Sequence, residues 1–104
     1  RGGENISCIE VEAAIYSHPD IHEVAVFGLP DERLGEIVGA AVVLREGVQV
    51  SADELCEYLA GQLAIFKIPA HIWFPTEQLP RIASGKIFKR QIKADYTAKL
   101  TLNK

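Results

Sequence analysis

The feature that most constrains the fold is an apolar run of seven residues, "VGAAVVL", at residues 38–44. A run of this length is far too short to cross a bilayer, which requires about 20 apolar residues. Its valines favour a buried strand, and the turn sequence "REG" follows it directly. The segment "EVAVFG", residues 23–28, has the same character and ends in glycine. Two such strands predict a small sheet at the centre of the fold.

The segments around these strands carry helix signals. Two Ser-x-x-Glu capping boxes, at residues 7–10 and 51–54, predict the starts of two helices. Apolar residues then recur at helical intervals: Cys8, Val11, Ala14 and Ile15 after the first box, and Leu55, Leu59 and Leu63 after the second. The first helix is expected to end before Pro19. A last helix is predicted near the C-terminus, with Phe88, Ile92 and Tyr96 on one side and Lys86, Arg90 and Lys93 near the other.

The order of these elements predicts the fold class. "HIWF", residues 71–74, is expected to be a third strand, and "LPDERLGE", residues 29–36, a polar loop with its turn at Pro30 and Asp31. The order α-β-β-α-β-α predicts a small two-layer α+β domain, in which a short, mostly three-stranded sheet is covered by helices. The 104 residues are enough for one domain. Because the chain contains no methionine, we expect it to be a fragment of a longer protein.

The charge of the chain is distributed unevenly. Residues 1–80 contain four Lys or Arg against thirteen Asp or Glu, a charge of −9, whereas residues 81–104 contain seven cations against one anion, a charge of +6. A basic C-terminal quarter on an acidic body indicates a site for an anion. A solvated helix face would carry the same charges, so the charge alone leaves both interpretations open.

Several common kinds of site are disfavoured. Cys8 and Cys56 match no metal-binding or Cys-x-x-Cys spacing, and we expect them to be reduced and buried. His18 and His22 could share a metal ion on one helix, but Pro19 interrupts that helix, so no metal ligand is predicted. Neither a phosphate-binding P-loop nor a dinucleotide-binding glycine motif is present.

The segment "LPRIASGKIFKRQI", residues 79–92, is the strongest candidate for chemistry. Gly85 gives the backbone freedom to project Lys86, whose ammonium is a compact charge suited to phosphate oxygens. A cation at a reacting phosphate or carboxylate stabilises developing negative charge, which is worth about 10²–10³ in rate. The alternative is that Lys86 has no chemical role and is only the first cation of a basic helix. The residues themselves do not decide between these two interpretations.

Four segments together resemble a known family. "RGGENISCIEVE", "HPDIHEVAVFGLPDERLGEIVGAAVVL", "FKIPAHIWF" and "LPRIASGKIFKR" occur in the order found in the C-terminal domain of the adenylate-forming enzymes. This superfamily includes acyl-CoA synthetases, aryl-CoA ligases, luciferases and peptide-synthetase adenylation domains. The resemblance covers nearly the whole chain, and the chain looks most similar to the fatty-acyl-CoA and aryl-CoA ligases.

The resemblance implies a function. Residues 1–104 would be the lid domain of an acyl-CoA synthetase, and its partner would be the large N-terminal domain of the same enzyme. The intact enzyme would use ATP to convert a carboxylic acid, expected to be a fatty acid, into an acyl-adenylate. It would then transfer the acyl group to coenzyme A. Mg²⁺ would act in the intact enzyme without binding to this domain, and the isolated domain is expected to be inactive.

The resemblance also implies roles for individual residues. Lys86 matches the lysine that acts in adenylate formation. A second set of residues matches positions near ATP or coenzyme A in the family: Gly2, Gly3 and Glu4 in the pantetheine channel, Asn5 near an ATP phosphate, and Phe66 and Lys67 near coenzyme A.

Two other functions remain as alternatives. The domain could belong to an adenylation enzyme that loads a carrier protein instead of free coenzyme A. The chain could also be a non-catalytic module that binds an anion or nucleic acid through its basic C-terminal segment. The charge of −9 on residues 1–80 is less consistent with this function. The acidic body leads us to expect no nucleic-acid partner. Because the apolar run at residues 38–44 is too short to span a bilayer, we expect no transmembrane segment. We also expect a cytoplasmic location.

Overall fold

The sheet at the centre of the fold consists of β1 (Ile21–Asp31), β2 (Gly35–Leu44) and β3 (His71–Trp73), in a computed structural model that describes residues 8–33 and 35–102. The spatial order is β1-β2-β3, so β2 is the central strand. β1 and β2 pair antiparallel over their whole length, whereas β2 and β3 pair parallel over three residues. The short apolar runs therefore form the sheet that the sequence predicts.

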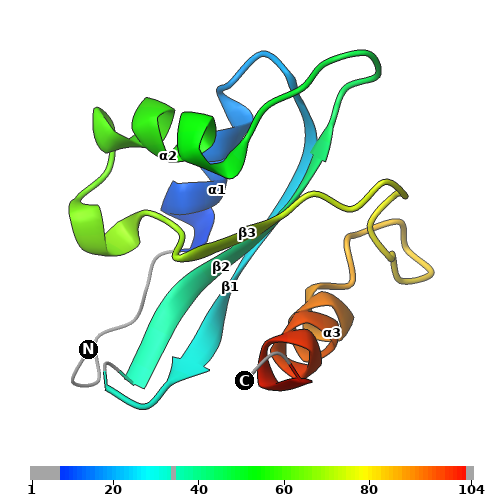
Figure 1. The fold of residues 1–104 in the computed structure, drawn as a ribbon. Coiled ribbons are helices and arrows are strands. Elements are labelled where there is room, and N and C mark those ends of the chain that lie inside the picture. The colour runs from blue at the N-terminus through cyan, green and yellow to red at the C-terminus, as the bar shows by residue number, and fades with distance from the viewer. Residues whose placement is uncertain (1–7, 34, 103–104) are drawn as a thin grey trace.

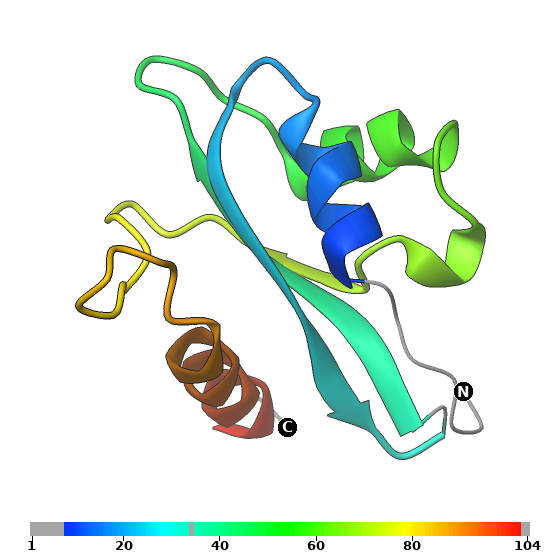
Figure 2. The same ribbon diagram turned by 180° about the vertical axis from the view of Figure 1, so that it is seen from behind.

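Helices cover both faces of this sheet (Figures 1 and 2). α1 (Cys8–Tyr16) and α2 (Ala52–Ala60) lie on one face, and α3 (Lys89–Leu102) lies on the other. A single 3-10 turn, η1 (Ile65–Lys67), connects α2 to β3. The order α-β-β-α-β-α and the small α+β class are confirmed.

Each face of the sheet has its own apolar core. The core under α1 and α2 includes Val11, Ile15, Val26, Val42, Leu55 and Leu59. The core under α3 includes Ala25, Phe27, Leu29, Ala41, Ile92 and Tyr96. In the second core the rings of Trp73 and Tyr96 are stacked at 4.5 Å between centroids. Alternation of side chains along the strands sends every second residue to each core, which is why the central parts of both strands are apolar on both faces.

A register shift near the start of β1 separates Ile21 from the regular alternation of the rest of the strand. Ile21 pairs with Leu44 and Glu23 with Val43, so β1 has one extra residue at this point. Such a bulge changes the phase of the alternation. Ile21 accordingly packs in the core under α1, whereas Glu23 has the same phase as Ala25 in the core under α3. The regular alternation that begins after the bulge thus puts the carboxylate of Glu23 on the α3 face.

The boundaries of three elements differ from those predicted. The segment at residues 29–36 is not a loop, because β1 continues to Asp31 and β2 begins at Gly35. Leu29 is fully buried, and Pro30 is tolerated because β1 is an edge strand that leaves one side of its backbone unpaired. The third strand ends at Trp73 instead of Phe74.

The helix boundaries follow local capping chemistry. The capping box of α2 is confirmed: Ser51 Oγ accepts a hydrogen bond from Glu54 N at 3.1 Å, and Ser51 N donates to Glu54 Oε1 at 2.8 Å. α1 ends at Tyr16, before Pro19, as predicted. Ser7, predicted to cap α1, lies outside the described residues. α3 begins only at Lys89, so the prediction that Lys86 and Phe88 lie on this helix is wrong.

Candidate functional site

Residues 79–88, called the lysine loop below, lie between β3 and α3 and include Lys86. A tight turn is closed by a hydrogen bond from Gly85 N to the Ile82 carbonyl at 2.9 Å, and Ile82 N donates to the Lys86 carbonyl at 2.9 Å. Gly85 has a φ of +95°, which glycine adopts at low cost. A turn followed by a glycine of positive φ is a common three-residue hairpin connection. Lys86 follows this glycine and is exposed, as expected for a side chain presented to another body.

A carboxylate on β1 holds the start of the lysine loop. Glu23 is 7% exposed, and its Oε1 accepts a hydrogen bond from Leu79 N at 3.1 Å. Its Oε2 forms an ion pair with Arg81 Nη2. Arg81 Nη1 in turn donates to the Gly85 carbonyl at 2.8 Å. No motif in the sequence predicts this arrangement, although a lone carboxylate in an otherwise apolar strand segment is a signal for it.

A second carboxylate, on α1, holds the segment where the loop enters α3. Glu12 Oε2 accepts a hydrogen bond from Val26 N, on the outer edge of β1, at 2.8 Å. The same oxygen lies 2.5 Å from Lys89 Nζ at the start of α3. Glu12 therefore links α1, the sheet edge and α3, and the lysine loop is fixed at both ends.

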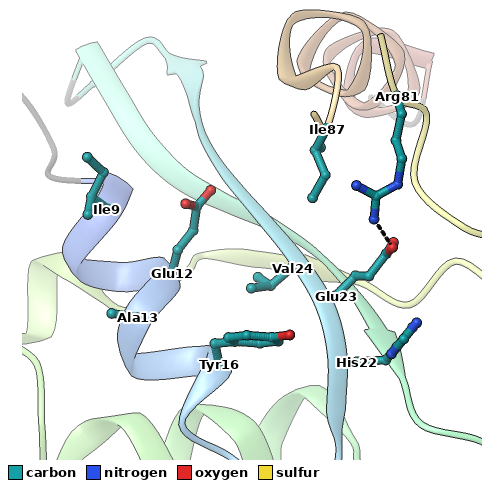
Figure 3. Close-up of a pocket in the computed structure, with 9 residues that line it drawn as sticks. All are labelled: Ile9, Glu12, Ala13, Tyr16, His22, Glu23, Val24, Arg81 and Ile87. Carbon is teal, nitrogen blue, oxygen red and sulfur yellow. Dashed lines mark hydrogen bonds and ion pairs between the residues drawn. The ribbon is translucent and has the colours of Figure 1, made fainter. Parts of the chain in front are cut away.

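A surface pocket of about 550 Å³ lies between α1, the edge of β1 and the lysine loop (Figure 3). Apolar side chains of α1 form one wall, and Glu23 with its partner Arg81 stands on the opposite side. The residues that line it include Ile9, Ala13, Tyr16, Val24, Arg81 and Ile87. Lys86 is not one of the lining residues, so the pocket adjoins the loop without containing its ammonium group.

The other residues predicted to bind substrates are only partly visible. Phe66 is exposed on η1, about half of its surface being accessible. Lys67 Nζ lies 2.8 Å from Glu10 Oε1 of α1 and 5.8 Å from the centroid of the Phe66 ring. This pair lies on the α1 and α2 side of the sheet, whereas the lysine loop leads to α3 on the other side. The remaining predictions, Gly2, Gly3, Glu4 and Asn5, lie outside the described residues.

Neither cysteine thiol is arranged as a nucleophile. Cys8 and Cys56 are both free, and each is only partly buried, whereas the sequence predicted full burial. Burial raises the pKa of the Cys8 thiol, with Lys89 acting in the opposite direction, and burial also raises the pKa of the Cys56 thiol. A raised pKa leaves less thiolate near neutral pH, and the thiolate is the reactive form.

The histidines do not share a helix face. His18 lies in the turn after α1, where its Nδ1 accepts a hydrogen bond from Asp20 N at 3.1 Å, and His22 lies on β1. No cluster of three or more His, Cys, Asp or Glu side chains in residues 8–33 and 35–102 could hold a metal ion. Within the same residues, no helix has the length and apolar character needed to span a membrane.

This fold and this loop define a C-terminal domain of the adenylate-forming type. The family model for the AMP-binding enzyme C-terminal domain matches residues 10–86, most of the chain, and ends at Lys86 itself. The chain therefore belongs to the family of AMP-binding enzyme C-terminal domains.

The chain is similar to part of several larger CoA ligases. Oxalate–CoA ligase of Saccharomyces cerevisiae is 44% identical over 104 residues, all of this chain and 19% of that protein. Crotonobetaine/carnitine–CoA ligase of Proteus mirabilis is 43% identical over 93 residues, 89% of this chain and 18% of that protein. A solved Mycobacterium tuberculosis fatty acyl CoA synthetase superposes with a TM-score of 0.84 at 42% identity, covering 94% of this chain and 19% of its own. The chain thus spans about a fifth of the length of these relatives.

Proposed function

We propose that this chain is the C-terminal domain of an AMP-forming acyl-CoA ligase and that Lys86 acts in adenylate formation. The observation that carries the proposal is an exposed lysine, held on an anchored hairpin, at the end of the segment that matches the family. The CoA ligases among the relatives support coenzyme A as the acceptor. The rest of the nucleotide and acid site would lie on an N-terminal domain of the same enzyme.

The chemistry assigned to Lys86 is charge stabilisation. In the first half-reaction, a carboxylate oxygen of the acid attacks the α-phosphate of ATP, and pyrophosphate leaves. The ammonium group would bridge the carboxylate and the nucleotide and stabilise charge as this bond forms. Lysine suits the task because its ammonium is a point charge on a long flexible stem. No described cluster of carboxylates offers a site for Mg²⁺, so we derive no step of the domain's own from that ion.

The second half-reaction would use a different part of the domain. We propose that Phe66 and Lys67, with the segment from Gly2 to Asn5, face coenzyme A when the acyl group is transferred. Phe66 offers an exposed ring, and Lys67 would have to exchange Glu10 for a coenzyme A phosphate. Phe66 and Lys67 lie on the α1 and α2 side of the sheet, whereas the lysine loop leads to α3 on the other side, which supports a different orientation of the domain in each half-reaction.

The acid that we propose is a fatty acid. A fatty acyl CoA synthetase is among the similar structures, but relatives also act on oxalate and on crotonobetaine or carnitine. Fatty acids, oxalate, crotonobetaine and carnitine serve as the first substrates for an assay of the full-length enzyme. We propose a cytoplasmic location for it.

The test of the function separates the two half-reactions in the full-length ligase. Lys86→Ala is expected to lower acid-dependent ATP–pyrophosphate exchange by about 10²–10³-fold, because the lost contact stabilises charge in that step. Thioester formation from supplied acyl-adenylate is expected to change little. Equal losses in both half-reactions would contradict the role given to Lys86. Lys99→Ala, on α3, is the matched control, since its Nζ lies 5.1 Å from the Tyr96 ring within the domain.

A further inference from the structure

Glu23 is the one charged side chain that is buried among the residues the structure describes. A buried carboxylate costs free energy unless each oxygen has a partner. Both oxygens of Glu23 have one, and both partners, Leu79 N and Arg81 Nη2, belong to the lysine loop. Glu23 has the same phase as Ala25 on the α3 face, because the two residues are two positions apart in the regular part of β1. The buried charge is therefore used to fasten the loop to the sheet.

Arg81 extends this anchor to the residue before Lys86. One guanidinium nitrogen pairs with Glu23, as Figure 3 shows, and the other donates to the Gly85 carbonyl at 2.8 Å. The planar guanidinium has several donors in a fixed geometry, so it can hold two acceptors at a set separation. An unbroken series of polar contacts thus runs from the sheet through Arg81 to the backbone that carries Lys86.

We propose that Glu23 and Arg81 are positioning residues, which hold the lysine loop so that Lys86 reaches the reacting groups during adenylate formation. This inference rests on the proposed function of Lys86. Neither side chain needs to touch a substrate in this role: Glu23 is buried, and Arg81 acts through the Gly85 carbonyl. Misplacing a catalytic group by about 1 Å can lower a rate by about 10²-fold, so loss of the anchor has a kinetic effect without any loss of Lys86.

Arg81→Met in the full-length ligase is the leading test. Arg81 is 39% exposed, and methionine keeps an unbranched apolar stem, so the loop loses its two hydrogen bonds without a cavity in the core. We expect ATP–pyrophosphate exchange to fall about 10²-fold and thioester formation from supplied acyl-adenylate to stay within about twofold. Arg81→Lys, which cannot hold both acceptors in the same geometry, is expected to recover only part of the exchange rate.

A double variant separates positioning from a general structural role. If Arg81 acts only through Lys86, adding Arg81→Met to Lys86→Ala lowers the residual exchange rate no further. Glu23→Gln, which keeps an acceptor for Leu79 N but loses the charge, is expected to behave as Arg81→Met does. Arg45→Met is the control, because Arg45 is also exposed and its Nε donates to a backbone carbonyl, that of Pro19, at 2.9 Å. It is expected to leave both half-reactions unchanged.

The outcomes distinguish this proposal from the one on which it rests. An exchange rate that survives Lys86→Ala overturns both proposals. An exchange rate that is lost with Lys86→Ala but kept with Arg81→Met overturns only the positioning role. Equal losses of both half-reactions in Arg81→Met, or a further loss on the Lys86→Ala background, also overturn it, because the residue would then act through more than Lys86.

Discussion

Gly85 is the residue on which the shape of the lysine loop depends most directly. Its φ of +95° lies in the region that side chains with a Cβ disfavour. A Cβ built at this position meets no other atom within 4 Å, so replacement by alanine adds conformational strain without a clash. We expect Gly85→Ala to lower the free energy of unfolding by about 1–2 kcal/mol. Urea unfolding followed by the fluorescence of Trp73, the single tryptophan of the chain, measures this change.

Gly61 provides the matched control for this prediction. It also has open space around a built Cβ, but its φ is −84°, which alanine adopts readily. Gly61→Ala is expected to be neutral or to stabilise the fold by about 0.4–1 kcal/mol, because alanine reduces the entropy of the unfolded chain. Equal destabilisation by the two substitutions would show that backbone conformation at Gly85 is not the cause.

Single residues also show why the part of the candidate site around Lys86 could be predicted from the sequence. Gly85 and Lys86 are adjacent, so the sequence alone indicates a glycine that presents a lysine. Glu23 and Arg81 are separated by more than half of the chain, and their ion pair depends on the path that brings the lysine loop beside β1. Local spacing carries no information about such a contact, because the fold brings the two residues together.

At the edge of the sheet, the side chain of Glu12 provides a hydrogen-bond acceptor for a backbone N–H group of β1. β1 is an edge strand, and Glu12 of α1 accepts a hydrogen bond from its Val26 N at 2.8 Å. Glu12→Ala would leave this buried donor without its acceptor, and Lys89 would lose its ion pair. We expect the free energy of unfolding to fall by about 1–3 kcal/mol, the usual cost of an unsatisfied buried polar group. Urea unfolding measures the effect.

Glu10, on the same helix, is the control for Glu12. Its carboxylate pairs with Lys67 Nζ at 2.8 Å near the surface. An exposed ion pair of this kind contributes about 0–1 kcal/mol, so Glu10→Ala is expected to have the smaller effect. If Glu10→Ala destabilises the chain as much as Glu12→Ala does, the hydrogen bond to the strand edge is not what makes Glu12 important.

Elements differed in how well the sequence predicted them. α2 was predictable because its start depends on two residues three positions apart, Ser51 and Glu54. The segment at residues 29–36 was not, because Pro30 and its charged neighbours are typical of a loop. Its extension into β1 and β2 depends on burial of Leu29 under α3 and on the edge position of β1, both of which are tertiary effects.

At the scale of the whole molecule, the sheet separates two cores. The helical periodicities predicted that helices cover the sheet, but they did not predict which face each helix covers. That assignment depends on the path of the chain between elements, such as the segment from β3 to α3 that crosses to the opposite face (Figure 2). The lysine loop is part of this crossing, and its first residue, Leu79, packs in the α3 core.

Two conservative substitutions test whether the two cores contribute independently. Ile15 in the α1 core and Ile92 in the α3 core are both almost fully buried and belong to separate clusters. Ile15→Val and Ile92→Val each remove one methylene group, and each is expected to lower the free energy of unfolding by about 0.5–1.5 kcal/mol. Because the sheet lies between the two sites, we expect the double variant to equal the sum of the single variants within about 0.5 kcal/mol. Urea unfolding of the four proteins gives this coupling energy. A larger value would mean that the sheet transmits packing changes from one core to the other.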